Sequence, residues 1–219
     1  RWEQTRLPQC FLAKLISYCK SEDDVDYAVE HSIFLQKLLS SRATHQSAAL
    51  GAASGLLHEC EARVEIFGSC LYGTNLPDAD LDVVGIVEPV GAWKGCSKIR
   101  FKSRAQDKLH SIVGQLKSSS DFKQVGFAVQ KLTVCYRHCG LNVDLTMGWS
   151  DHRPLTLSTR LCSLLDRAEA DHTPPCGIRC LVRLVVDWAR QRRLCHHRNR
   201  GAIMTLKAVH WTILVWACF

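Results

Sequence analysis

The sequence predicts an α+β fold in which a small mixed β-sheet is preceded and followed along the chain by helices. Short apolar runs of strand length, rich in β-branched residues, are confined to residues 58–150. The segments on either side, 1–57 and 151–219, instead carry apolar residues at helical spacing. We therefore expect a sheet-containing domain over 58–150. The N-terminal helices of 1–57 should pack with those of 151–219 into a second, helical domain.

Residues 8–58 are predicted to form three helices. In the first two, apolar side chains recur every three or four positions: Phe11, Leu12, Leu15, Ile16 and Cys19, then Val25, Val29, Ile33, Leu38 and Leu39. Ser21 followed by Glu22-Asp23-Asp24 is a typical start for the second helix, because a serine hydroxyl can cap free N–H groups and acids favour the positive end of the helix dipole. The third helix, rich in Ala and Leu, is expected at about 45–58.

The rest of the chain alternates between the two kinds of element. Strands are predicted at Val64–Phe67, Leu81–Val87, Val125–Tyr136 and Leu141–Met147, with a turn at Arg137–Gly140. Helices are predicted at about 104–117, 155–169, 177–193 and 202–217. Three tryptophans at helical spacing in the last two helices are predicted to be core residues: Trp188, Trp211 and Trp216.

Composition limits the class of protein. The 219 residues include 47% apolar residues and carry a net charge of +7, which suits an anionic partner such as RNA or a merely basic soluble protein. The apolar stretch Ile203–Phe219 contains Lys207 and His210 and is shorter than the ~20 residues that span a bilayer, so we expect a buried helix and no membrane contact. The start has no apolar signal segment, and we interpret the 12 cysteines as mostly reduced. We expect an intracellular protein. The cytoplasm is the first choice of compartment, and the nucleus and the mitochondrion are the alternatives.

Three aspartates within apolar strands indicate a metal site. Asp80 and Asp82 are two residues apart, so on a strand their side chains point to the same face. Asp144 lies between Val143 and Leu145 in a later strand. Carboxylates in such surroundings are costly unless a cation compensates them, and hard divalent cations prefer oxygen ligands. We therefore expect two Mg²⁺ or Mn²⁺ ions, one held by all three acids and the other by Asp80 and Asp82. Asp144 could also accept the proton of an attacking hydroxyl.

A Gly-Ser pair precedes these acids. Gly68-Ser69 follows a strand and opens a short helical segment, where a glycine lets a phosphate approach the backbone and the serine hydroxyl adds a donor. The alternative for an isolated Gly-Ser pair is a plain turn. Gly73 and the turn at Asn75–Pro77 would then bring Ser69 close to Asp80.

At this point the chain resembles a known family. The pattern Gly68-Ser69-x3-Gly73-x6-Asp80-x-Asp82 with the distal Val143-Asp144 is similar to the polymerase-β-type nucleotidyltransferase superfamily. The detail Phe-Gly-Ser-x3-Gly-x2-Leu-Pro-x2-Asp-Leu-Asp resembles its RNA-tailing branch, the cytoplasmic-type poly(A) polymerases and terminal uridylyltransferases. Leu181–Arg193 and Gly201–Ala217 resemble two helices of that branch's central domain, so the resemblance covers about 60–217. It implies a nucleotidyltransferase palm domain followed by a helical central domain that is truncated in this incomplete chain.

The resemblance also implies roles for residues in the helical part. Arg190 stands where the family has a cation that reaches the triphosphate, and Thr205 could replace a serine that contacts phosphate. Two positions depart from the family pattern: Val186 stands in place of a lysine, and Leu206 in place of a tyrosine that stacks on the nucleobase. The basic run from Arg190 to Arg200 could bind RNA or triphosphate, or be a solvated helix end.

The function expected from these features is template-independent transfer of AMP or UMP from an NTP to RNA 3′ ends. One alternative is a catalytically impaired RNA-binding or scaffold relative of the same fold, which Val186 and Leu206 favour. Another is a nucleotidyltransferase that acts on a non-RNA acceptor. The preferred nucleotide, the RNA and the protein partners are not readable from this sequence.

Overall fold

The computed structural model describes residues 21–170, 177–192, 194 and 206–217. By its internal contacts the chain divides into two compact units. The sheet unit comprises 41–71 and 78–159, and the helical unit comprises the described residues of 1–40, 72–77 and 160–219. The assignment of domains to 1–57, 58–150 and 151–219 remains a prediction.

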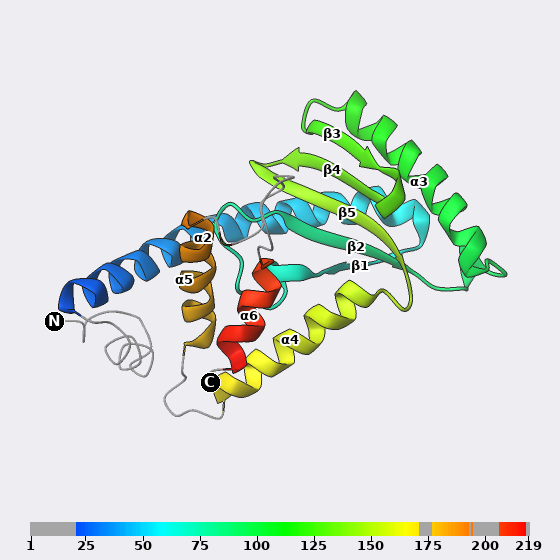
Figure 1. Cartoon of the computed structure of the whole chain (residues 1–219). Coiled ribbons are helices and arrows are strands. Elements are labelled where there is room, and N and C mark those ends of the chain that lie inside the picture. The colour runs from blue at the N-terminus through cyan, green and yellow to red at the C-terminus, as the bar shows by residue number, and fades with distance from the viewer. Residues whose placement is uncertain (1–20, 171–176, 193, 195–205, 218–219) are drawn as a thin grey trace. The chain divides into compact units, whose positions relative to one another are not determined.

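The sheet unit is built on five strands in the order β1-β2-β5-β4-β3 (Figure 1). Their bounds are β1 Arg63–Ile66, β2 Leu81–Val87, β3 Lys123–Ala128, β4 Thr133–His138 and β5 Leu141–Trp149. The central pair β2/β5 is parallel and the other three pairs are antiparallel, so the sheet is mixed as predicted. The predicted turn before β5 is confirmed: Cys139 and Gly140 join β4 to β5 with positive φ angles of 49° and 79°.

One face of the sheet is covered by helix. Helix α3, Lys98–Ser118, buries Phe101, Ala105, Leu109, Ile112 and Leu116 on a single face, and Ser97 caps its first turn by accepting from the Arg100 N–H. The last turns of α2 contribute Ala49, Ala53 and Leu57 to the same core. Alternate residues of the strands, such as Leu81, Val83 and Val143, face these helices. The residues between them therefore face the other way, and these include Asp82 and Asp144.

The helical unit packs α2 (Glu22–Leu57), α4 (Arg153–Ala170), α5 (Ile178–Gln191) and α6 (Ala208–Ala217). The first part of α2 and the last part of α4 belong to it. Helix α5 places Ile178, Val182, Val186 and Ala189 in its core, at the spacing of one helix face. No helix in the described ranges is long and apolar enough to cross a membrane. The helix predicted within 8–20 lies outside the described residues.

Three sequence-based predictions are wrong. The second and third helices expected before residue 58 form one 36-residue helix, α2, because no Pro or Gly interrupts Leu39–Ala49. Ser21 does cap it, since its hydroxyl accepts from the Asp24 N–H at 3.2 Å. The strand expected at Val125–Tyr136 is a hairpin, because Leu132 takes a left-handed conformation (φ 51°) after the turn Val129–Lys131.

Trp188 is the third exception. Its side chain is 48% exposed, although Trp211 and Trp216 pack against the core as predicted. Successive helical residues are about 100° apart, so Trp188 lies roughly 200° around α5 from the buried Val186. Trp188 contacts Trp211 edge to face, with ring centroids 6.4 Å apart.

Candidate active site

The three predicted aspartates lie on, or directly before, two neighbouring inner strands of the sheet. Asp82 and Asp144 are direct register partners on the parallel strands β2 and β5. Asp80 lies one residue before β2 and is also partly buried. The Asn142 side chain, which the sequence analysis did not single out, donates to Asp80 Oδ1 at 3.1 Å. A carboxylate pair on neighbouring strands is thus placed side by side by the sheet register itself.

Negative charge accumulates around Asp82. Burial raises the pKa of Asp82 to about 7, with further contributions from the neighbouring charges of Asp144 and Asp80. A carboxyl group in this environment needs a positive partner in order to stay ionised. The three aspartates together offer only oxygen ligands, which is the kind of ligand that a hard divalent cation prefers. Within the described part of the chain, however, no three His, Cys, Asp or Glu side chains already converge as a ligand set. The residues therefore fit a cation by charge and donor type, while the side-chain arrangement is not that of a closed site.

Gly68 explains why a glycine precedes the acids. It begins a short 3-10 turn, Gly68–Cys70, one residue after β1, with φ at +68°. A Cβ at this position would lie 2.3 Å from Asp82 Oδ2, so any side chain would displace the carboxylate. The Gly68 N–H donates to Ser158 Oγ at 2.9 Å, and that hydroxyl donates to the Pro154 carbonyl at 2.8 Å. Ser69 is the second residue of the same turn, and its place beside Asp80 stays a prediction.

Further residues at this site carry no motif that would have revealed them. Ser158 reaches Gly68 from α4, 90 residues away in the chain. Arg42 is 5% exposed on α2 and donates to the Ala79 carbonyl, next to Asp80. Burial raises the pKa of the Cys70 thiol to about 11, and its Sγ contacts the Asp80 carbonyl at 3.7 Å. Only the tertiary fold brings these groups to the acids, because each lies in an ordinary helical or turn sequence.

The predicted phosphate contacts of the helical part belong to the other unit. Arg190 lies near the end of α5 and is partly buried. Thr205 lies outside the described residues. Val186, which stands in place of the family's lysine, is 2% exposed in the apolar core, whereas Leu206 is 38% exposed.

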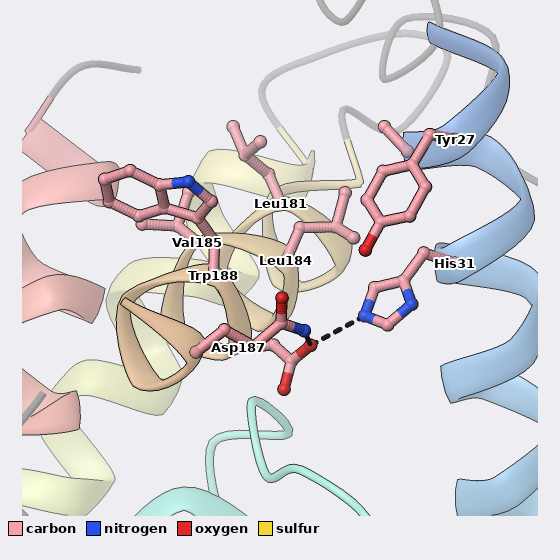
Figure 2. Close-up of a pocket in the computed structure, with 9 residues that line it drawn as sticks. Tyr27, His31, Leu181, Leu184, Val185, Asp187 and Trp188 are labelled. Carbon is pink, nitrogen blue, oxygen red and sulfur yellow. Dashed lines mark hydrogen bonds and ion pairs between the residues drawn. The ribbon is translucent and has the colours of Figure 1, made fainter. Parts of the chain in front are cut away.

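A separate pocket lies within the helical unit, between α2 and α5 (Figure 2). Its volume is about 320 Å³, and its walls are mostly apolar, with Leu181, Leu184 and Trp188 from α5. Tyr27 and His31 project from α2 with their rings stacked at 5.6 Å, and His31 Nε2 pairs with Asp187 Oδ2 at 2.6 Å. None of the predicted site residues lines this pocket.

No protein-family model and no curated protein sequence matches this chain. Solved structures do match it. With mtPAP bound to ATPγS, the TM-score is 0.59 at 16% identity over 94% of this chain and 43% of that chain. With Cid1, described as an RNA terminal uridylyl transferase, it is 0.55 at 15% identity, covering 84% and 51%. With terminal uridylyl transferase 4 from Trypanosoma brucei, bound to UTP and UpU, it is 0.56 at 17% identity, covering 84% and 56%.

This chain therefore spans about half the length of the structures it matches. At these identities the likeness concerns the fold. The expected α+β architecture, with a mixed sheet and accompanying helices, is confirmed as the nucleotidyltransferase fold that poly(A) polymerases and terminal uridylyltransferases share.

Proposed function

We propose that this chain is part of a template-independent RNA nucleotidyltransferase that adds AMP or UMP from an NTP to RNA 3′ ends inside the cell. The catalytic domain would comprise 58–150, and the helices of 1–57 and 151–219 would form the central domain. The observation that carries this proposal is the pairing of Asp82 with Asp144 across β2 and β5, packed against Gly68. The fold shared with enzymes of RNA tailing supports it.

The acids would act as oxygen ligands. Asp80, Asp82 and Asp144 would hold Mg²⁺ or Mn²⁺, and a cation there would offset the burial and the neighbouring negative charges that raise the pKa of Asp82. Two bound ions would favour deprotonation of the RNA 3′ hydroxyl and neutralise charge on the triphosphate and the leaving pyrophosphate. Asn142 would hold Oδ1 of Asp80 beside this site.

The remaining residues would bind and orient the reactants. The RNA 3′ oxygen attacks the α-phosphorus, a new P–O bond forms, and the bond to pyrophosphate breaks. Asp144 would accept the proton of the attacking hydroxyl. The Ser69 hydroxyl would donate to a phosphate oxygen, and a phosphate at Gly68 would replace Ser158 as partner of its N–H. Arg190 and Thr205 would be the phosphate contacts of the helical part.

One observation favours a second candidate, a non-catalytic relative that binds RNA or a protein. Val186 is 2% exposed in an apolar core, so this position cannot supply the cation that the family places there. Arg190 would then be the only cation of that pair to reach the triphosphate, and nucleotide affinity would be low.

The test uses the full protein with a labelled RNA, Mn²⁺ or Mg²⁺, and each NTP separately. We expect a ladder of extended products with ATP or UTP. The double variant Asp80→Ala/Asp82→Ala should lose it while staying folded by circular dichroism. Extension of a non-RNA acceptor alone would redirect the proposal to another nucleotidyltransferase. Folded protein that binds RNA but extends nothing with any NTP would favour the non-catalytic relative.

A further inference from the structure

The connection between Gly68-Ser69 and Asp80 is buried. Four of its residues are almost fully covered: Tyr72 is 5% exposed, Thr74 4%, Asn75 8% and Leu76 2%. Connecting segments usually run over the surface, because buried backbone groups must find hydrogen-bond partners. The segment Tyr72–Pro77 therefore needs specific partners, and helix α5 provides them.

Two arginines, one helical turn apart on α5, bind two consecutive carbonyl groups of this segment. Arg179 Nε donates to the Tyr72 carbonyl at 2.9 Å. Arg183 Nη2 donates to the Gly73 carbonyl at 2.5 Å. Residues four apart on a helix share a face, so both guanidinium groups can reach the same segment.

Two acids of α4 orient the Arg179 guanidinium. Arg179 Nη2 pairs with Asp166 Oδ1 at 2.6 Å, and Nη1 pairs with Glu169. Only 17% of the Arg179 side chain is exposed. The planar guanidinium of Arg179 thus binds three partners with three different nitrogens: the Tyr72 carbonyl, Asp166 and Glu169. A lysine has a single ammonium group and cannot reproduce this arrangement.

Gly73 allows this close approach. Its φ is +70°, and a Cβ there would lie 3.1 Å from both Cδ and Nε of Arg179. The left-handed backbone and the tight contact both favour glycine at this position. The glycine of the sequence motif and the arginine of α5 are therefore parts of one contact.

Burial of Arg183 is costly in free energy. Burial lowers the pKa of its guanidinium, and among the described residues its Nε has no hydrogen-bond partner. A buried cation costs stability unless its contacts compensate. Its guanidinium donates to the Gly73 carbonyl and also interacts with Cys180 of its own helix, so the contact that leaves α5 and compensates this burial is the one to the Tyr72–Pro77 segment.

We propose that Arg179 and Arg183 are positioning residues for the nucleotidyltransferase site, an inference that rests on the function proposed above. By holding the carbonyls of Tyr72 and Gly73, they fix the chain that leaves Ser69 and enters Asp80 and Asp82. One helix, α5, thus anchors the connection at two consecutive carbonyls.

The experiment compares Arg179→Lys, Arg183→Lys and Arg183→Met in the full protein. Mn²⁺ affinity is measured by electron paramagnetic resonance, and kcat and the KM for NTP are measured per folded protein. We expect Arg179→Lys and Arg183→Met to lower kcat about tenfold or more, because a misplacement of ~1 Å can cost on the order of 100-fold. Mn²⁺ affinity should fall and the KM for NTP should change little. Arg183→Lys should retain function, since one ammonium can still reach one carbonyl.

Gly73→Ala tests the same contact from the other side. It should reproduce the Arg179→Lys defect, and the double variant should be no worse than either single one, because both changes break one contact. Arg167→Gln is the matched control, since Arg167 is an exposed arginine of α4 in the same unit.

The inference is overturned if these variants only lower the thermal midpoint, with kcat and Mn²⁺ affinity per folded protein as in the wild type. Additive effects of Gly73→Ala and Arg179→Lys would also overturn it. If the wild type extends no RNA, the proposed function fails. The Mn²⁺ affinities, with Asp82→Asn as the reference for a lost ligand, still decide whether the two arginines position the acids.

Discussion

Replacing Gly68 by alanine should damage the candidate site through a contact that the structure locates. A non-glycine residue in the left-handed region costs ~1–2 kcal/mol, and Gly68 has φ +68°. The added Cβ would also lie 2.3 Å from Asp82 Oδ2, and overpacking of this kind costs ~1–3 kcal/mol. We therefore expect Gly68→Ala to lower the free energy of unfolding by roughly 2–5 kcal/mol. Displacement of the Asp82 carboxylate should also weaken Mn²⁺ binding.

Gly140→Ala is the matched control. Gly140 also has a positive φ, +79°, but its Cβ would meet nothing within 4 Å. Gly140→Ala should therefore lower the free energy of unfolding by the backbone contribution alone, ~1–2 kcal/mol, and leave Mn²⁺ affinity unchanged. In an Asp82→Ala background, Gly68→Ala should lower the free energy of unfolding by the same amount, because the carboxylate that its Cβ would contact is gone. Urea unfolding and Mn²⁺ titration measure both effects. Equal losses for Gly68→Ala and Gly140→Ala, in both measurements, would refute the reasoning.

Two further predictions concern buried charge. Folding raises the pKa of Asp82 from 3.8 to about 7, so the folded state binds more protons between these values, and in metal-free buffer stability should fall as pH rises through that window. Asp82→Asn should flatten this decline of stability with pH, and Mn²⁺ should offset it at pH 8. Parallel profiles of stability against pH for the wild type and the variant would show that Asp82 is not the group that titrates. Val186→Lys would bury a cation at a position only 2% exposed, and should lower stability by ~3 kcal/mol or more without improving NTP affinity. Leu214→Lys, at a 47% exposed position of α6, is its control; a stable Val186→Lys with a lower KM for NTP would show that this side chain faces the nucleotide.

Local patterns were sufficient where the physics is local. Leu81–Val87 was predicted as a strand with the bounds that the structure has. The reason is that short apolar runs rich in β-branched residues favour strands. The capping role of Ser21 followed from its position before three acids. The placement of Asp82 within that strand followed from the same run, whereas Asp80, which the sequence analysis also treated as a strand residue, lies directly before it.

Predictions failed where the outcome depends on what an element packs against. Two separate helices were expected where α2 is continuous, because helical hydrogen bonds continue wherever no residue forbids them. The hairpin β3/β4 turns at residues that include neither Gly nor Pro, so no turn signal is present. Trp188 has the apolar character of a core residue, but its angular position on α5 leaves it partly exposed.

The sequence by itself determined the mixed α+β class, most of the strands, and the identity of the acids, because strand periodicity and the cost of an uncompensated carboxylate are properties of short segments. The tertiary structure alone decided that Asp82 faces Asp144, that Ser158 reaches Gly68, and that Arg179 and Arg183 hold the carbonyls of Tyr72 and Gly73. These contacts join residues 62 to 110 positions apart. Their geometry is set by sheet register and helix packing, which no local pattern encodes.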